Sequence, residues 1–221
     1  MKPLADCRLY AFVDSAYLHG REPAELAQQL CEGGADILQL RAKDWTESEV
    51  REAAEAILPI TRAAEVPLVI NDHWALASKL GAEFCHLGQE DFFEPDDDPT
   101  PELAFPGPQL GLSSHAPEQA EAALAEDADY IAVGPVFPTP TKPGRTAVTL
   151  EYVRWAAEHL RDCPWFAIGG ITLENVDEVL AAGARRICVV SAILNAPDVA
   201  HACQQFQERL ASCLLYTSPS P

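Results

Sequence analysis

Two acidic residues follow neighbouring apolar runs of the sequence and are candidates for holding a cation. The run at 68–70 ends in Asn71-Asp72, and the run at 84–87 leads into a polar stretch that ends at Asp91. Two carboxylates that approach each other without partners repel, and such an arrangement favours the capture of a cation. The alternative is that both are ordinary polar turns that cap helices. The choice depends on whether the fold brings Asp72 and Asp91 together.

Gln39, Arg41 and Lys43 alternate along a predicted strand and form a candidate phosphate site. Alternate side chains of a strand share one face. Arginine supplies a planar fork of donors and lysine a point charge, a combination that suits phosphate oxygens. An exposed strand end that neutralises neighbouring acids is the alternative. The nearby Asn71 and the acidic residues favour the phosphate interpretation.

A second candidate anion site lies near the C-terminal end of the chain. The segment AIGGIT, residues 167–172, predicts a strand that ends at Gly169-Gly170 and opens a helix. Glycines let a phosphate approach backbone N–H groups, and a helix N-terminus attracts anions. Val190 and Ser191 end the next predicted strand. A tight turn is the alternative for the two glycines alone.

The loop GPVFPTPTKPGR, residues 134–145, is stiffened by prolines and carries Thr139, Thr141, Lys142 and Arg145. Its hydroxyls and cations indicate ligand contact by a lid, and a rigid surface loop is the alternative.

Three histidines near these strand ends receive no catalytic role. His86 lies inside a predicted strand, where a lone histidine is usually a satisfied structural residue, and His73 begins a predicted helix. His115 lies at a strand end with no role assigned. The sequence contains no Ser-His-Asp order, Walker loop or GxGxxG motif.

The elements that must position these residues alternate between short apolar runs and longer helical patterns, which is typical of repeated βα units. Segments such as PAELAQQLCEGG and TLENVDEVLAAGA space their apolar residues by three and four, as outer helices do. Thr46 with Glu49 and Thr172 with Asn175 indicate helix starts. The eight expected strands cover residues 8–14, 37–41, 67–72, 84–87, 109–113, 130–136, 165–169 and 187–191.

This pattern predicts an α/β protein that consists of a single (β/α)8 TIM barrel over residues 1–214. In such a barrel the functional groups come from the C-terminal ends of the strands, and the rim after strands seven and eight is a frequent phosphate site. Nearly every unusual polar residue named above falls at that rim. Strands three and four are neighbours, so Asp72 and Asp91 are expected to approach each other.

One helical unit and the tail depart from the repeat. The segment FFEPDDDPTPELAFPGP, residues 92–108, contains five prolines and predicts a shortened or irregular fourth helical unit with at most one or two helical turns. We interpret Asp96–Asp98 within it as a solvated loop. The tail at 215–221 is expected to be disordered and not part of the natural protein.

Composition excludes several classes of protein. The 221 residues carry a net charge of −19, which argues against nucleic-acid partners and anionic membranes. No apolar stretch is long enough for a membrane span, and a signal peptide is not expected. The seven scattered cysteines form no CxxC pair, so we expect a cytoplasmic protein with buried free thiols. An anionic ligand would require the few basic residues to gather where it binds.

Seven motifs together resemble the thiamine phosphate synthase (thiamine-phosphate pyrophosphorylase) family. They are QLRAK, INDHWALA, HLGQED, GLSSH, DYIAVGPVFPTPTK, AIGGIT and VVSAI. They occur in the order of the family and cover roughly residues 8–195. Each motif alone is modest, and their succession is highly specific.

The resemblance implies a transferase that joins an aminopyrimidine methyl diphosphate to hydroxyethylthiazole phosphate, releases pyrophosphate and requires Mg²⁺. It implies that the pyrimidine diphosphate is held by Gln39, Arg41, Lys43, Asn71, Ser113 and Lys142. Arg41, Lys43, Lys142 and Ser113 are the catalytic candidates among them. It implies that Asp72 and Asp91 bind Mg²⁺. It implies that the thiazole phosphate is held by Thr139, Thr141, Gly170, Val190 and Ser191.

The residues themselves agree with this chemistry, because two anion sites on one rim match two phosphorylated small-molecule substrates. Such a reaction needs positioning and charge screening and no protein nucleophile. Two alternatives stay open: a thiazole phosphate tautomerase-like isomerase and a non-catalytic phosphate-binding barrel. The isomerase would have no use for the QxRxK motif and the paired acids. The oligomeric state is not predicted.

Overall fold

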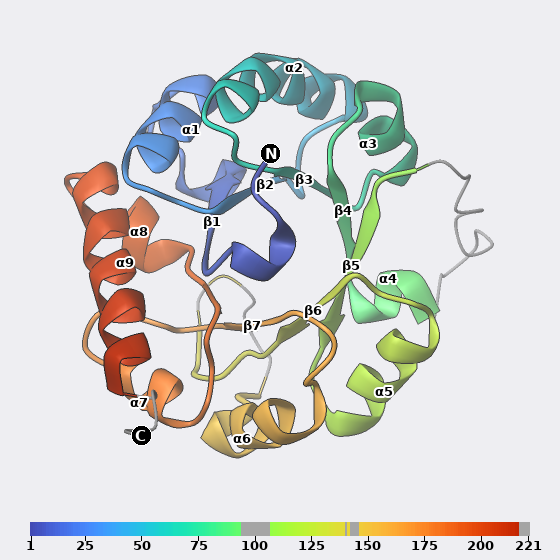
Figure 1. The fold of residues 1–221 in the computed structure, drawn as a ribbon. Helices are drawn as coiled ribbons and strands as arrows, with labels where there is room; N and C mark the ends of the chain where they lie inside the picture. Colours follow the sequence, from blue (N-terminus) through green and yellow to red (C-terminus); the bar gives the residue numbers. More distant parts are fainter. Residues whose placement is uncertain (94–106, 140, 142–145, 217–221) are drawn as a thin grey trace.

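Runs of β-branched and aromatic residues form eight parallel strands that close into a barrel, and helices surround it in the computed structural model (Figure 1). The structure describes residues 1–93, 107–139, 141 and 146–216. The strands are β1 (Leu9–Asp14), β2 (Ile37–Arg41), β3 (Leu68–Asn71), β4 (Phe84–Leu87), β5 (Gln109–Ser114), β6 (Tyr130–Val133), β7 (Trp165–Ile168) and β8 (Ile187–Cys188). Strand β1 pairs with both β2 and β8, which closes the barrel and confirms the predicted fold class.

The helices follow the strands in chain order. They are α1 (Pro23–Glu32), α2 (Glu47–Ala63), α3 (Trp74–Leu80), α4 (Gln89–Phe93), α5 (Pro117–Ala125), α6 (Thr149–His159), α7 (Val176–Ala181), α8 (Ser191–Leu194) and α9 (Val199–Tyr216). Two short 3-10 helices, η1 (Leu4–Asp6) and η2 (Ser15–Tyr17), flank β1. Among the helices of the described residues, none is long and apolar enough to cross a membrane.

Four strands end earlier than the sequence pattern predicted, and β3 stops one residue early, at Asn71. Strand β6 stops at Val133 because Pro135 has no N–H to continue the ladder. Strand β7 stops before Gly169, whose φ of 103° is not a strand conformation. Strand β8 keeps only two residues, and the chain turns through Val190 into α8 at Ser191. The rim is therefore built from more loop backbone than expected.

The helix starts agree with the sequence signals. The amide N–H of Thr46 donates to the Glu49 carboxylate at 2.7 Å, and the Glu49 N–H donates to the Thr46 hydroxyl at 3.4 Å. This capping box begins α2. The Thr172 N–H donates to Asn175 Oδ1 at 2.8 Å in the turn before α7. His73 lies directly before α3, as predicted.

Most of the fourth helical unit, predicted to be short or irregular, lies outside the described residues. Helix α4 has five residues, and residues 94–106 lie outside the described part of the chain, together with Asp96–Asp98. At the other end, α9 continues through residues 215 and 216, and residues 217–221 also lie outside it.

Acidic residues directly before β2, β4 and β6 bind the backbone of the preceding strand. The Asp36 carboxylate accepts hydrogen bonds from the N–H groups of Arg8 and Leu9 at 2.8 and 2.9 Å. Glu83 accepts from Leu68 at 2.9 Å. Asp129 accepts from the N–H of Leu110 in the same way, so these acids satisfy backbone donors at or near the starts of β1, β3 and β5.

Replacing Asp36 by alanine is expected to lower the free energy of unfolding by about 3 kcal/mol at neutral pH, because it orphans two backbone donors in a buried place. Burial alone would raise the pKa of Asp36, but hydrogen bonds from Lys2, Leu9, Gln207 and Arg8 outweigh it and hold the pKa below its usual value. The ionised carboxylate therefore stabilises the fold above its unfolded pKa. That contribution is lost as the pH falls through the folded pKa.

Urea unfolding of the Asp36→Ala variant across a pH series checks this prediction, with the exposed Asp162→Ala as the control. The stability gap to the unmodified protein should narrow in acid. An equal gap at neutral and acidic pH would show that the charge of Asp36 contributes nothing.

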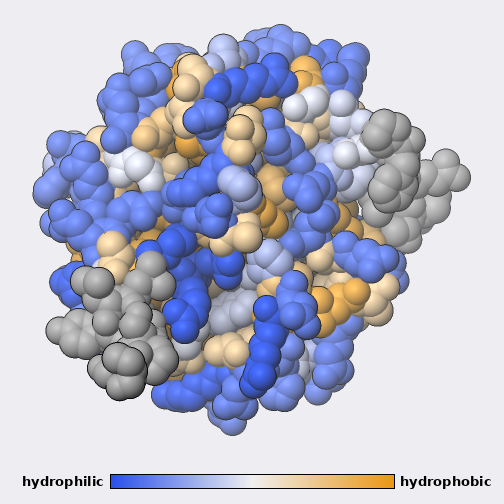
Figure 2. All heavy atoms as spheres, viewed as in Figure 1, coloured by the Kyte–Doolittle hydropathy of each residue, from blue (hydrophilic) through white to orange (hydrophobic). Residues whose placement is uncertain are grey.

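The N-terminal segment crosses the end of the barrel opposite to the strand C-termini, and in Figure 1 it lies across the middle of the ring. The Lys2 N–H donates to the Glu65 carbonyl at 2.9 Å, and the Arg186 guanidinium donates to the Ala5 carbonyl at 2.8 Å. Figure 2 shows that this face is mostly hydrophilic, with small apolar patches. This end is therefore closed by the chain itself, and the opposite rim is left for ligands.

The cysteines whose side chains the structure describes are all free. Burial raises the pKa of Cys31 and Cys163 to about 11 in each case. These thiols therefore stay protonated and pack as small apolar groups, as predicted.

Candidate functional site

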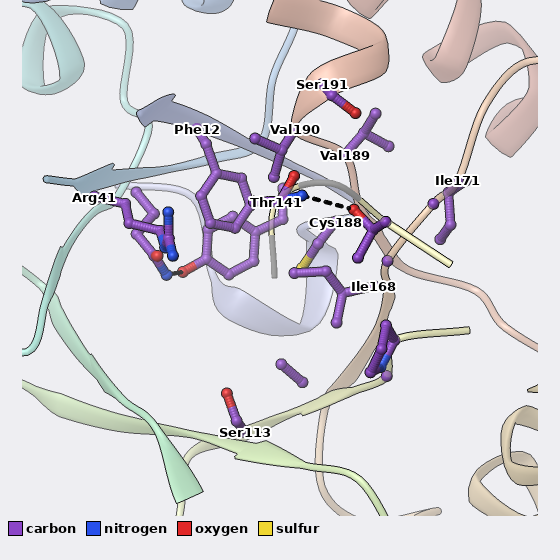
Figure 3. Close-up of a pocket in the computed structure, with 18 of the residues that line it drawn as sticks. Phe12, Arg41, Ser113, Thr141, Ile168, Ile171, Cys188, Val189, Val190 and Ser191 are labelled. Carbon is purple, nitrogen blue, oxygen red and sulfur yellow. Dashed lines mark hydrogen bonds between the residues drawn. The ribbon is translucent and has the colours of Figure 1, made fainter. Parts of the chain in front are cut away.

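One pocket opens at the rim formed by the C-terminal ends of the strands. It has an empty volume of about 830 Å³, its open mouth included. Nine residues singled out from the sequence line it: Gln39, Arg41, Asn71, Ser113, Thr139, Thr141, Gly170, Val190 and Ser191. Figure 3 shows Arg41, Ser113 and Ser191 on different sides of the same hollow. The structure therefore brings the two predicted anion sites into one cavity.

Arg41 is held by a carboxylate that the sequence analysis did not single out. Its Nη1 donates to Asp14 Oδ2 at 2.8 Å, and the Asp14 side chain is only 1% exposed. The other Asp14 oxygen accepts from the Ala16 N–H at 3.0 Å and begins η2. Asp14 lies at the end of β1, so its position at the rim was the signal that could have identified it.

Lys43, Asp72 and Asp91 form an ion-pair cluster at the rim. Lys43 Nζ lies 2.6 Å from Asp72 Oδ2 and 3.7 Å from Asp91 Oδ2. The predicted approach of the two acids is therefore confirmed, and the lysine ammonium lies between them. Gly88 permits this arrangement, because a Cβ there would lie 2.3 Å from Asp91 Oδ2.

Asp72 is held in an unusual conformation. Its φ of 66° is in the left-handed region, which non-glycine residues rarely adopt. Its N–H donates to the His86 carbonyl at 2.9 Å. Its Oδ1 atom is buried and has no hydrogen-bond partner among the described residues. A buried carboxylate oxygen without a donor is a suitable ligand for a cation.

The cations at this rim are outnumbered by the carboxylates that they contact. Two cations, Arg41 and Lys43, meet three carboxylates, Asp14, Asp72 and Asp91, so these five side chains carry a net charge of −1. Other basic residues, such as Arg51 and Arg209, form ion pairs on outer helices. The expected gathering of basic residues at the rim is thus only partly met, and Lys142 lies outside the described residues.

The loop that follows β6 packs against the end of β7, next to Gly170 of the predicted second anion site. The N–H groups of Val136 and Phe137 donate to the carbonyls of Ile168 and Gly169 at 2.8 and 3.0 Å. A Cβ at Gly170 would lie 2.6 Å from the Pro138 carbonyl, so glycine is required for this loop packing. Gly170 therefore has a packing role that the sequence alone did not reveal.

The two threonines of the loop contact each other, and Thr141 also contacts η2. The Thr141 hydroxyl lies 3.1 Å from the Tyr17 hydroxyl, and the Thr141 N–H donates to Thr139 Oγ1 at 3.3 Å. His115 Nδ1 hydrogen-bonds the Gly134 carbonyl, so this histidine holds the start of the loop. Residues 140 and 142–145, including Arg145, lie outside the described part of the chain.

Aromatic side chains fill the barrel interior next to the pocket. Tyr10 packs edge to face against Tyr130 and Phe166, with ring centroids 5.9 and 5.3 Å apart. Tyr10 and Phe12 stack at 5.1 Å, and both line the pocket. The sequence analysis missed these residues, because an aromatic residue in a strand is ordinarily a core residue.

His86 is satisfied on both ring nitrogens, as expected for a structural histidine. Its Nδ1 lies 3.1 Å from the Tyr130 hydroxyl and its Nε2 lies 3.0 Å from the Ser113 hydroxyl. It also lines the pocket, so it contacts a predicted ligand-binding residue.

Fold and pocket define a (β/α)8 barrel with a ligand pocket of polar and apolar residues at the C-terminal rim, the place where barrel enzymes carry their active sites. The thiamine monophosphate synthase family model matches residues 9–193. The chain therefore belongs to the thiamine monophosphate synthase family, a family of transferases.

Individual relatives agree. A thiamine-phosphate synthase of Thermus thermophilus is 53% identical over 180 residues, which cover 80% of this chain and 84% of the relative. A thiamine-phosphate synthase of Acidothermus cellulolyticus is 44% identical, and the match covers 95% of this chain and 97% of the relative. The solved structure of thiamine phosphate pyrophosphorylase from Pyrococcus furiosus superposes with a TM-score of 0.80 at 30% identity. The superposition covers 94% of this chain and 97% of that structure.

Proposed function

We propose that the protein condenses an aminopyrimidine methyl diphosphate with hydroxyethylthiazole phosphate, and that thiamine phosphate and pyrophosphate are the products. The observation that carries this proposal is the single pocket that joins both predicted anion sites. One side offers Gln39, Arg41 and Asn71, and the other offers the β7 and β8 ends. Two phosphorylated substrates can therefore meet with their reacting groups between the anion sites.

The proposed reaction is a dissociative substitution. The bond between the methylene carbon and the diphosphate oxygen breaks, and the oxygen keeps the electron pair. The electron-rich aminopyrimidine stabilises the methylene cation, and the thiazole nitrogen then donates its lone pair to that carbon. Arg41, Lys43 and Lys142 screen the leaving diphosphate, and Ser113 donates a hydrogen bond to the pyrimidine diphosphate. No protein nucleophile is needed.

The charge balance supports a requirement for Mg²⁺. A diphosphate that approaches side chains with a net charge of −1 needs a further cation. Asp72 and Asp91 would hold this ion, since Mg²⁺ in proteins takes one or two carboxylates and completes its shell with water and phosphate oxygens. The donorless Asp72 Oδ1 fits this role. When bound, Mg²⁺ would neutralise charge on the diphosphate.

The decisive experiment measures pyrophosphate release with both substrates, with each substrate alone, and with or without Mg²⁺. We expect release only when both substrates and Mg²⁺ are present. Isomerisation of the thiazole phosphate without pyrophosphate would indicate the tautomerase-like activity. Binding of both ligands without turnover would indicate a non-catalytic barrel.

We also propose a cytoplasmic location, in keeping with the free buried thiols.

The variant Ser191→Asp tests the thiazole phosphate site. Its added charge would face the proposed phosphate, and two unit charges a few ångströms apart near a protein surface repel by roughly 2 to 4 kcal/mol. We expect the KM for the thiazole phosphate to rise by at least about tenfold, with the KM for the diphosphate nearly unchanged. This variant is preferable to one at Gly170, where any side chain would also displace the loop.

Steady-state kinetics with each substrate varied in turn provide the measurement. Ser48→Asp makes the same chemical change at an exposed position on α2 and serves as the control. Equal weakening of both substrates in Ser191→Asp would argue against a thiazole phosphate at Ser191.

A further inference from the structure

A chain of hydrogen bonds crosses the barrel from Gln39 to Ser113. Gln39 Nε2 donates to the Tyr10 hydroxyl at 2.6 Å, and that hydroxyl lies 2.9 Å from the hydroxyl of Tyr130. The Tyr130 oxygen lies 3.1 Å from His86 Nδ1, and His86 Nε2 lies 3.0 Å from Ser113 Oγ. The five residues come from five strands, β2, β1, β6, β4 and β5, and all are buried.

The number of available hydrogens gives this chain a direction. Burial raises the pKa of Tyr10 and of Tyr130 well above the usual value, so each hydroxyl keeps its one hydrogen. Tyr10 accepts from Gln39 and directs its own hydrogen to Tyr130, which directs its hydrogen to His86 Nδ1. With the Gln39 amide nitrogen facing the Tyr10 hydroxyl, the opposite direction would leave the Tyr10 hydrogen without an acceptor in this chain, and an unpaired buried donor is destabilising.

The direction of the hydrogen-bond chain determines the tautomer of His86 and the hydrogen bonds that Ser113 can make. His86 accepts on Nδ1, so its hydrogen is on Nε2 and is donated to Ser113 Oγ. Ser113 then has its own hydroxyl hydrogen available for a ligand in the pocket that it lines. At the other end, the Tyr10 hydroxyl engages one N–H of the Gln39 amide, which turns the carbonyl oxygen of that amide away from Tyr10 as an acceptor.

We propose that Tyr10, Tyr130 and His86 are positioning residues that set hydrogen-bond polarity at both ends of the pyrimidine site. They orient Gln39 as an acceptor and Ser113 as a donor, and they hold His86 as the Nε2–H tautomer. The statement about the ligand rests on the proposed function, and the statement about the tautomer does not.

This polarity selects the chemistry of the ring that binds. An aminopyrimidine presents an amino donor, which suits the Gln39 carbonyl, and ring nitrogens and phosphate oxygens that can accept from Ser113. A ring with an oxo group in place of the amino group would place its oxo oxygen, an acceptor, against the Gln39 carbonyl oxygen, which is also an acceptor. We expect the amino substrate to be preferred over its oxo analogue by about a hundredfold, because an unpaired buried acceptor is costly.

The test is the nitrogen-15 NMR spectrum of the histidine rings in the substrate-free protein. His86 is expected to show a protonated Nε2 and a bare Nδ1. The variant Gln39→Glu replaces the donor by a carboxylate that only accepts, so the chain should reverse and His86 should change to the Nδ1–H tautomer. The substitution Tyr10→Phe removes the hydroxyl that joins residue 39 to Tyr130. His86 should therefore stay in the Nε2–H form in Tyr10→Phe alone and also in the double variant with Gln39→Glu.

Tyr152→Phe is the matched control. It removes a buried hydroxyl that hydrogen-bonds Ser114 and the Ala116 carbonyl outside the chain, and it should leave the tautomer of His86 unchanged. A native protein with Nδ1–H or doubly protonated His86 would overturn the proposal, even if Gln39→Glu failed to fold. So would a Gln39→Glu protein that folds and keeps the Nε2–H form.

Kinetics of the Tyr10→Phe variant separate this proposal from the proposed function. In Tyr10→Phe the KM for the pyrimidine substrate should rise about tenfold, while the KM for the thiazole phosphate stays unchanged. In the control Tyr152→Phe the KM values for both substrates should stay unchanged. If the tautomers behave as expected but no thiamine phosphate forms, the proposed function is wrong and the hydrogen-bond polarity stands. If thiamine phosphate forms and His86 shows the other tautomer, the polarity proposal is wrong.

Discussion

Replacing Asp72 or Asp91 by asparagine is expected to raise the Mg²⁺ concentration for half-maximal activity by roughly tenfold to a hundredfold. Each substitution removes a charged ligand, and contacts to charged groups contribute about 1.5 to 3 kcal/mol. Both variants should fold normally, because Asp72 and Asp91 are 27% and 53% exposed and bind no backbone donor through their side chains in the described structure. Removing both should cost less than the sum of the single effects, since they serve one ion.

The measurement is a Mg²⁺ titration of the initial rate, with Asp44→Asn as the control. Asp44 is exposed and follows β2, next to Lys43, so it tests the effect of one fewer negative charge at this rim. A normal Mg²⁺ dependence in either single variant would show that the two acids do not share an ion.

Arg41→Lys is expected to lower turnover by about tenfold to a hundredfold. Lysine keeps a positive charge beside Asp14 but loses the planar fork that can bind Asp14 and a phosphate together. Alanine is the poorer choice, because it would leave the buried Asp14 carboxylate unpaired, and breaking such a pair costs about 3 to 5 kcal/mol of stability. A loss of activity in Arg41→Ala would therefore combine misfolding with lost binding.

The measurement compares kcat and KM of Arg41→Lys with its melting temperature, and Arg51→Lys provides the control. Arg51 pairs with Glu47 on the outer helix α2, where the exchange should change neither activity nor stability. Unchanged turnover in Arg41→Lys would remove Arg41 from the list of diphosphate ligands.

Most of the barrel could be predicted, because each strand and helix carries a local signal. Apolar runs gave the eight strands, and the Thr46–Glu49 pair gave the start of α2. The strand ends were predicted less well. At Val133, Ile168 and Cys188 the apolar pattern continues while the backbone has already left the sheet.

The site could be predicted wherever its residues are polar and lie at the strand ends. Asp72 and Asp91 approach each other because β3 and β4 are neighbours, and this follows from topology alone. The partners of the site residues were harder to predict. The position of Asp14 at the end of β1 was the signal for its pairing with Arg41 on the next strand. Tyr130 acts through a contact with Tyr10 on a strand far away in the sequence, and a buried tyrosine looks the same in a pattern whether or not its hydroxyl is used.

The position of Lys43 between the two acids has a thermodynamic consequence. Its ammonium already neutralises part of the charge of Asp72 and Asp91. If the acids hold the proposed ion, that ion would release Lys43 toward the diphosphate, and a diphosphate that draws Lys43 away would expose the acids. Each ligand would then strengthen the binding of the other by the same factor, as linkage requires. Under the proposed function, neither the metal nor the diphosphate should therefore bind tightly by itself.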